Sequence, residues 1–206
     1  DWSSDVCSSD LNMKNVKVVF AGDSSVGKTC IIGRIKDHEF HENGDATVGA
    51  ANCEVKVNTG TEDVTLTIWD TAGQEKYRSL TPIYFNGAAL AILVFDITNK
   101  STLSELDFFV QAINNKSPDY VKFVLVGNKA DLQERREVTQ EQAENYANDI
   151  DASFYIEISA KTCAGVDELF QRACSIPDLH FDNAIDAGVL STENSKHFEK
   201  RKKCQC

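Results

Sequence analysis

The stretch Gly22-Asp23-Ser24-Ser25-Val26-Gly27-Lys28-Thr29 decides the fold that this sequence predicts. It follows an apolar, strand-like run that begins at Lys14, and the residues after it have the spacing of a helix. The octet fits the pattern G-x-x-x-x-G-K-[ST], in which glycines bend the backbone so that successive N–H groups point at phosphate oxygens. The positive end of the following helix strengthens the attraction for anions. The octet therefore predicts a nucleoside triphosphate site of the kind that ATP- and GTP-binding proteins share.

Two side chains of this octet have expected roles of their own. Lys28 is expected to reach the β- and γ-phosphates and to assist catalysis, and the Thr29 hydroxyl is expected to hold Mg²⁺. The other nucleotide-contacting residues expected here are Ser24, Ser25, Val26, Gly27 and Cys30. The alternative interpretation is a Gly/Ser turn that joins a strand to a helix and binds nothing.

Strand-like and helical patterns alternate along the rest of the chain. Apolar or alternating runs predict strands at 14–22, 53–59, 64–70, 89–96, 122–127 and 153–158. Helical spacing covers 29–36, 103–113, 139–150 and 166–176, and Thr139 with Gln142 has the pattern of a capping box. Because strands alternate with helices, we expect an α/β fold with a mostly parallel sheet and helices on both faces.

The segment Asn128-Lys129-Ala130-Asp131 predicts a base-binding site. It follows the apolar run that ends at Gly127, at the edge of the sheet where such folds bind ligands. Guanine presents two adjacent donors, and the Asp131 carboxylate can accept a hydrogen bond from both. Adenine would leave that carboxylate unpaired, which costs about 1–3 kcal/mol or more. The stem of Lys129 is expected to lie over the plane of the base.

A second segment, Ser159-Ala160-Lys161, follows the last predicted strand. The N–H of Ala160 is expected to donate to the guanine carbonyl. The segment Asn128–Asp131 alone would be a weak signal, because polar turns after strands are common. Its position about a hundred residues after Lys28 is what favours a guanine site.

Asp70-Thr71-Ala72-Gly73-Gln74 is expected to sense the γ-phosphate. Asp70 would hold Mg²⁺ through water, the Gly73 N–H would contact the phosphate, and Gln74 would orient the attacking water. Thr47 is a candidate second Mg²⁺ ligand that only the triphosphate state orders. Phe40 is either a residue that contacts the guanine edge-on or an ordinary core residue.

These motifs together resemble the Ras superfamily of small GTPases, over about residues 14–178. The segments GDSSVGKT, WDTAGQEKYRSL, GNKADL and EISAKT stand in the order of that family. The resemblance implies a P-loop small-GTPase fold with a mostly parallel six-stranded sheet, one antiparallel edge strand, and helices on both faces. It implies GTP and GDP as ligands, Mg²⁺ as cofactor, and a domain spanning residues 13–178.

Within that superfamily the chain is similar to the Rab branch. WDTAGQE followed by YRSL and a terminal C-x-C are typical of Rabs, and 47–51 and GNKADL resemble the early-endosome subgroup. Rabs of that kind usually have Phe where this chain has Asn52. That aromatic, with the equivalents of Trp69 and Tyr84, forms the surface that effectors read. The resemblance implies a switch in vesicular, endosomal membrane traffic.

The C-terminal segment 179–206 is expected to be a flexible tail with a prenylation motif. The chain has a net charge of −11, yet basic residues cluster within 196–203, and the chain ends in Lys-Lys-Cys-Gln-Cys. An acidic body argues against nucleic-acid binding, whereas a basic tail favours an anionic membrane. By resemblance, Cys204 and Cys206 are lipidation sites that place the protein on the cytoplasmic face of intracellular, endosomal membranes, in exchange with the cytosol.

Regulatory proteins are implied as well. No arginine in the phosphate or switch motifs is placed to act as a finger in cis, so we expect slow intrinsic hydrolysis and an activating protein. The resemblance adds an exchange factor, a GDP-dissociation inhibitor and effectors that bind the switch regions. Two alternatives are a Rab-like nucleotide-binding scaffold with little or no hydrolysis, and a P-loop ATPase or kinase. Gln74, Thr47 and Asp70 speak against the first, and Asn128 with Asp131 against the second.

The remaining features place limits on the protein. Residues 1–12 are interpreted as a cloning-derived segment, because they resemble a translated sequencing adapter and precede the only methionine, Met13. The longest apolar run, Ala88 to Phe95, is too short for a span of ~20 residues, which predicts a cytosolic chain. The five cysteines before the tail are expected to be plain buried thiols without disulfides: Cys7, Cys30, Cys53, Cys163 and Cys174.

Overall fold

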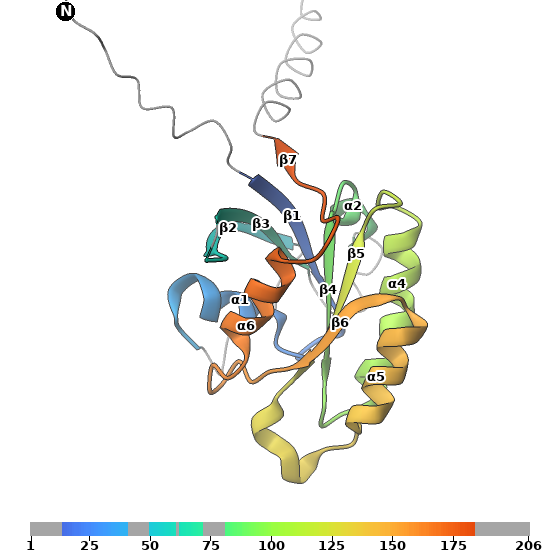
Figure 1. Cartoon of the computed structure of the whole chain (residues 1–206). Helices are drawn as coiled ribbons and strands as arrows, with labels where there is room; N and C mark the ends of the chain where they lie inside the picture. The colour runs from blue at the N-terminus through green and yellow to red at the C-terminus, as the bar shows by residue number, and fades with distance from the viewer. Residues whose placement is uncertain (1–13, 41–49, 61, 72–80, 184–206) are drawn as a thin grey trace, which may run out of the picture.

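The structure, a computed structural model, describes residues 14–40, 50–60, 62–71 and 81–183. Its strands are β1 (Lys14–Ala21), β2 (Ala50–Asn58), β3 (Asp63–Thr71), β4 (Leu90–Asp96), β5 (Lys122–Asn128), β6 (Ala152–Glu157) and β7 (Asp182–Asn183). Its helices are α1 (Lys28–Asp37), α2 (Thr81–Phe85), α3 (Lys100–Ser104), α4 (Leu106–Asn114), η3 (Ala130–Arg135), α5 (Gln140–Asp149) and α6 (Val166–Cys174). Figure 1 shows one sheet with helices on both of its faces.

The sheet has the order β2-β3-β1-β4-β5-β6. All neighbouring pairs along this path are parallel except β2 with β3, which form the predicted antiparallel hairpin at one edge. The predicted six-stranded α/β fold is confirmed. Because β1, β4, β5 and β6 run in the same direction, the loops after their carboxyl ends meet at one edge of the sheet.

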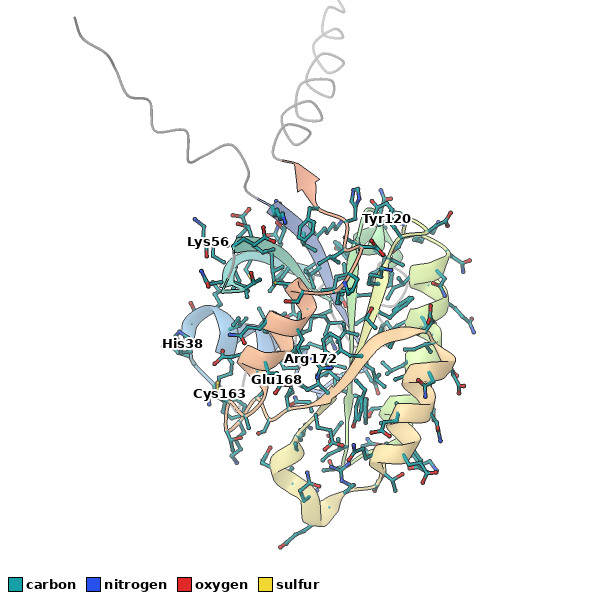
Figure 2. The ribbon with its side chains drawn as sticks, viewed as in Figure 1. His38, Lys56, Tyr120, Cys163, Glu168 and Arg172 are labelled. Atoms are coloured by element: carbon teal, nitrogen blue, oxygen red, sulfur yellow. The ribbon has the colours of Figure 1, made fainter. Side chains whose placement is uncertain are left out.

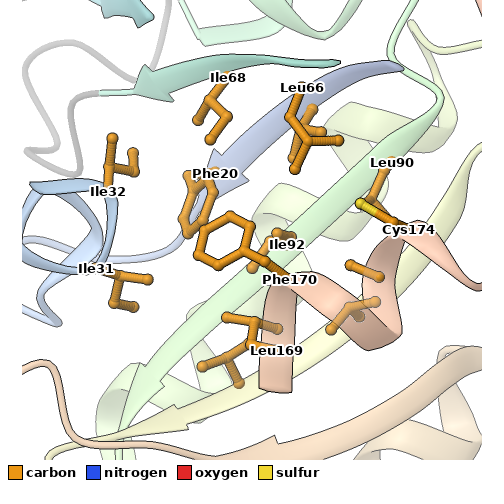
Figure 3. Close-up of a cluster of buried hydrophobic side chains, with 14 of the residues drawn as sticks. Phe20, Ile31, Ile32, Leu66, Ile68, Leu90, Ile92, Leu169, Phe170 and Cys174 are labelled. Atoms are coloured by element: carbon orange, nitrogen blue, oxygen red, sulfur yellow. The ribbon is translucent and has the colours of Figure 1, made fainter. Parts of the chain in front are cut away.

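The central strands are apolar throughout because helices cover both of their faces. Alternate residues of β1 and β4 point to opposite sides, as the two-residue period of a strand requires. Phe20 and Ile92 belong to the core under α1 and α6, where the Phe20 and Phe170 rings lie 6.3 Å apart (Figure 3). Val19 and Leu93 belong to the core under α4 and α5. A packed core on each face therefore fixes the strands whose ends carry the loops of the predicted site.

Two details differ from the predicted elements. The predicted helix over 103–113 is divided into α3 and α4 at Glu105, and Asn99 caps α3 by accepting a hydrogen bond from the Ser101 N–H. The predicted tail begins at residue 179, but Leu179 is buried and β7 pairs antiparallel with the start of β1. The fold continues past residue 178 because Leu179 and Phe181 are apolar and contact the core, and strand pairing with β1 extends to Asn183. The capping box of Thr139 and Gln142 is confirmed.

The cysteine prediction was right for Cys174, which is buried, and wrong for Cys30, Cys53 and Cys163, which are half-buried. Cys53 lies on β2 at the edge of the sheet and Cys163 in the turn before α6, and both pack against the core only in part. Cys7, residues 1–12 and the C-terminal cysteines lie outside the described residues.

Among the helices that the structure describes, none combines the length and the apolar character that crossing a membrane requires.

Candidate functional site

The phosphate loop connects β1 to α1 and has the backbone that the octet predicts. Gly22 and Gly27 have φ values of 146° and 98°, which L-residues with a side chain rarely adopt. A Cβ atom at Gly22 would collide with the carbonyl of Val94 on β4, and one at Gly27 with the side-chain amide of Asn128. The two glycines therefore allow the loop to lie directly against β4 and against the predicted base-binding segment.

Lys28 is buried at the start of α1, with 6% of its surface exposed. Its ammonium group donates hydrogen bonds of 2.8 and 2.7 Å to the carbonyls of Gly22 and Asp23, so it lies inside the loop. Burial lowers the pKa of Lys28 to about 8, an effect that Asp70 and Asp23 oppose. A phosphate group in the loop would add negative charge beside this buried ammonium and so favour its protonated form.

Thr29 and Asp70 meet at the predicted metal site. The Thr29 hydroxyl donates a hydrogen bond of 2.6 Å to Asp70 Oδ2, which joins the first turn of α1 to the end of β3. Asp70 is 5% exposed. A hydroxyl and a carboxylate are oxygen ligands of the kind that Mg²⁺ prefers. The third predicted ligand, Thr47, lies outside the described residues, as do Gly73 and Gln74.

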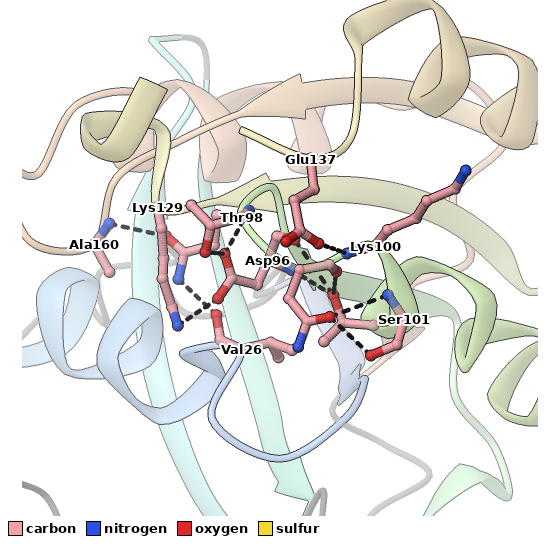
Figure 4. Close-up of polar contacts among 11 residues, drawn as sticks. Val26, Asp96, Thr98, Lys100, Ser101, Lys129, Glu137 and Ala160 are labelled. Atoms are coloured by element: carbon pink, nitrogen blue, oxygen red, sulfur yellow. Dashed lines mark hydrogen bonds and ion pairs between the residues drawn. The ribbon is translucent and has the colours of Figure 1, made fainter. Parts of the chain in front are cut away.

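Asn128 connects the base-binding segment to the two other loops. Its Nδ2 donates to the carbonyl of Val26 at 2.8 Å, and its Oδ1 accepts from the N–H of Ala160 at 3.1 Å (Figure 4). Asn128 is only 2% exposed. The phosphate loop and both base-binding segments therefore form one hydrogen-bonded unit. A guanine carbonyl would share the Ala160 N–H with Asn128 or replace Asn128 as its partner.

Asp131 is held by its neighbour across the site. The Ser159 hydroxyl donates a hydrogen bond of 2.6 Å to Asp131 Oδ1, and Ser159 itself accepts one of 3.1 Å from the Thr162 N–H. This leaves Asp131 Oδ2 and the second lone pair of Oδ1 as acceptors for a base. Because Ser159 is buried, it fixes the direction in which the Asp131 carboxylate points.

Lys129 has a partner that the sequence analysis did not identify. Its backbone is left-handed, with φ of 66°, and its ammonium forms a 2.6 Å ion pair with Asp96 Oδ2 at the end of β4 (Figure 4). The Lys129 ammonium and hydrogen bonds from Thr98 together outweigh burial, which is the largest single influence, and hold the pKa of Asp96 below its ordinary value. A carboxylate at the end of a buried apolar run indicates that Asp96 has a polar partner, but the run does not reveal that this partner is Lys129. Asp96 anchors the end of the Lys129 stem.

Of the two interpretations offered for Phe40, the structure supports the packed residue, and the contact with guanine stays a prediction. It is half-buried and packs against the core under α1, and the guanidinium carbon of Arg34 lies 5.3 Å from the centre of its ring. The structure therefore makes Phe40 a packed residue at the margin of the site. Cys30 is also half-buried, and burial raises the pKa of its thiol.

Comparison with known proteins agrees with this geometry. Residues 17–176 match the Ras family. The chain belongs to the Ras family. That matched segment contains every loop described above.

Among the proteins similar to this chain are Ras-related proteins, two of which are named as Rabs in the comparisons below. It is 40% identical to the Ras-related protein Rab5 of Nicotiana tabacum, over 77% of this chain and 79% of the relative. It is 39% identical to the Ras-related protein RHN1 of Nicotiana plumbaginifolia, over 80% and 82% of the two chains. It is 39% identical to the Ras-related protein Rab-22A of Mus musculus, over 78% and 82%. The chain is therefore a Rab-type small GTPase of the early-endosome type, a GTP-binding and GTP-hydrolysing switch in membrane traffic.

Proposed function

We propose that separate residues at the carboxyl edge of the sheet recognise the base, bind the phosphates and promote hydrolysis. The arrangement of Asp131 carries the proposal for the base: a buried Ser159 holds one carboxylate oxygen at 2.6 Å, and the free acceptors match the two adjacent donors of guanine. Adenine offers no such pair of donors. Asn128, Lys129, Ala160 and Lys161 complete the base site.

The phosphates are proposed to lie in the loop of residues 22–29. Lys28 would exchange its two carbonyl acceptors for the β- and γ-phosphate oxygens, and the backbone N–H groups from Ser24 to Cys30 would surround them. Mg²⁺, when bound between Thr29, Asp70 and Thr47, would neutralise phosphate charge. The proximity of Thr29 and Asp70 supports this placement.

Hydrolysis is proposed to follow the in-line course of phosphoryl transfer. Gln74 would align a water molecule, whose oxygen forms a bond to the γ-phosphorus as the bond to the β-phosphate oxygen breaks. Lys28 and the Gly73 N–H would stabilise the charge that develops on the phosphate oxygens. The scaffold without hydrolysis is not favoured, since the chain keeps Gln74, Thr47 and Asp70.

Regulatory partners and a membrane anchor are proposed from the same motifs. An exchange factor, an activating protein, a GDP-dissociation inhibitor and effectors would act on the segments around Thr47 and Gln74. Cys204 and Cys206 would carry two lipid chains that hold the protein on the cytosolic face of endosomal membranes. The N-terminal segment 1–12 is proposed to be cloning-derived.

Nucleotide competition tests the base assignment. Wild-type protein should bind GDP tightly with Mg²⁺ and bind ADP weakly. Asp131→Asn should bind GDP less well and gain affinity for xanthosine diphosphate, because an amide can donate to the second ring carbonyl of xanthine. Equal competition by ADP and GDP in the wild type would overturn the assignment. Single-turnover hydrolysis of GTP then tests the hydrolytic role of Gln74 separately.

A further inference from the structure

Arg34, on the second turn of α1, contacts the Ala160–Lys161 turn, the residue that follows α1, and the ring of Phe40. Its guanidinium group donates hydrogen bonds of 2.7 Å to the carbonyl of Ala160 and 2.7 Å to that of Lys161. It donates a third, of 2.9 Å, to the carbonyl of His38, directly after α1. The same group lies over the ring of Phe40. The planar, five-donor guanidinium suits this fork of contacts, which the ammonium of a lysine could not reproduce.

These contacts fix the orientation of two peptide planes in the base-binding turn. In a trans peptide the C=O and the following N–H point in opposite directions. When Arg34 holds the carbonyl of Lys161, the N–H of Thr162 must face the opposite way, toward Ser159. That N–H does donate to Ser159 Oγ at 3.1 Å, and Ser159 Oγ donates in turn to Asp131 at 2.6 Å. A chain of contacts therefore runs from Arg34 through the turn to the carboxylate that faces the base.

We infer that Arg34 is a positioning residue for guanine selectivity. It acts through the Lys161–Thr162 peptide and Ser159 to aim Asp131 at the two donors of the base, and this inference rests on the guanine-reading role proposed for Asp131. Arg34 also holds Phe40 at the margin of the site. It would not touch the phosphates, because its partners lie in the turn after β6 and at the end of α1.

The test compares GDP with inosine diphosphate, which lacks the exocyclic amine of guanine. Affinities of both nucleotides are measured for wild type, Arg34→Ala, Arg34→Lys and Ser159→Ala in the full chain with Mg²⁺. We expect the preference for GDP over inosine diphosphate to fall about ten-fold in Arg34→Ala, the size expected when one hydrogen bond to a charged group is lost. The nucleotide preference of Arg34→Lys should lie between those of wild type and Arg34→Ala, since a lysine ammonium reaches only one of the two carbonyls.

Arg172→Ala is the matched control. Arg172 lies on α6, the neighbour of α1 (Figure 2), and its guanidinium also covers an aromatic ring, Phe154, at 4.2 Å. Its ion pair is with Glu168 at 3.4 Å, away from the base-binding turn. Arg172→Ala should lower stability at most and leave the nucleotide preference unchanged.

The double variant Arg34→Ala/Ser159→Ala shows whether the effect passes through Ser159. If it does, the double variant prefers GDP no less than Ser159→Ala alone, because the two changes break the same chain of contacts. An unchanged preference in Arg34→Ala, with only a lower unfolding temperature, would overturn the inference and leave the role of Asp131 intact. If Arg34→Ala does not fold, Arg34→Lys takes its place. A preference for GDP in Arg34→Lys equal to that of wild type would then overturn the inference. Failure of the wild type to prefer GDP would refute the proposed function instead.

Discussion

The hydroxyl of Thr29 donates a 2.6 Å hydrogen bond to the carboxylate of Asp70, forty-one residues later in the chain. This contact joins the start of α1 to the end of β3 and places the two proposed Mg²⁺ ligands side by side. Lys28, which is buried, directly precedes Thr29 in the chain. The Asp70 carboxylate opposes the lowering of the Lys28 pKa that burial causes. The side chains proposed to bind Mg²⁺ and phosphate therefore form one small group, and we expect the binding of the two to be coupled.

Thr29→Asn should weaken the binding of Mg²⁺ and of GTP more than that of GDP. The larger amide removes the hydroxyl ligand and displaces the Asp70 carboxylate, and the loss of a charge-assisted contact predicts at least a ten-fold fall in GTP affinity. Titration with fluorescent GTP and GDP, with and without Mg²⁺, measures this. Equal affinities of variant and wild type for GTP in Mg²⁺ would show that Thr29 is not a ligand.

Lys28 should make the stability of the nucleotide-free protein depend on pH. Its pKa in the folded chain is about 8, below the ordinary 10.5, so between these values the unfolded chain binds more protons. Stability should therefore rise with pH through that window, relative to Lys28→Met, which has no titrating group there. Urea unfolding of both proteins in EDTA, from pH 7 to pH 10.5, gives the difference. Parallel pH profiles would mean that the pKa of Lys28 is not lowered.

Gln74→Leu should leave GTP binding intact and slow hydrolysis. Leucine has a similar volume but cannot orient water, and misplacing the nucleophile can cost about a hundred-fold when an activating protein is present. Single-turnover release of phosphate, with and without that protein, is the measurement. Gln133→Leu, on the surface of η3, serves as the control. Hydrolysis at the wild-type rate in Gln74→Leu would contradict the role assigned to Gln74.

Asn52→Phe should strengthen the binding of effectors that recognise early-endosome Rabs. Asn52 lies directly opposite Trp69 in the β2–β3 pair, so both side chains lie on one face of the sheet. There the Trp69 and Tyr84 rings are 5.8 Å apart. A third aromatic would extend this pair, and burying one at an interface contributes about 1.5–3 kcal/mol, or roughly ten-fold or more in affinity.

The measurement for Asn52→Phe is a pull-down with GTP-loaded and GDP-loaded protein. Asn58→Phe, exposed at the far end of β2, is a matched control for added hydrophobic surface. The same gain in both variants, or no gain in Asn52→Phe, would remove Asn52 as a determinant of effector binding.

Replacing Cys204 and Cys206 together with serine should release the protein from membranes without changing GTP binding or turnover. One lipid chain gives only marginal membrane binding, with an association constant of about 10⁴ M⁻¹, so either single replacement should give weak association. Fractionation of cells that express the tagged chain measures the distribution. Membrane association of the double variant would place the anchor elsewhere.

The sequence alone was enough for the order of the six main strands and for most of the helices, and it proposed the main site residues. It did not reveal α2, η3 or β7. Glycine spacing in 22–27, alternation of apolar residues in β3, and uninterrupted apolar runs in β4 and β5 are local properties of the chain, and local sterics and burial determine what they form. The motif residues Lys28, Thr29 and Asp131 follow in the same way from the chemistry of their side chains.

Tertiary structure alone decided how those residues hold one another. Arg34 on a helix, Asp96 after a strand and Leu179 in a polar segment have no local pattern that reveals their partners. Their roles depend on contacts with residues far away in the chain: Arg34 with Ala160, Asp96 with Lys129, and Leu179 with the core. Because the sheet brings the ends of β1, β4, β5 and β6 to one edge, the packing of strands creates these contacts, and no short segment contains both partners.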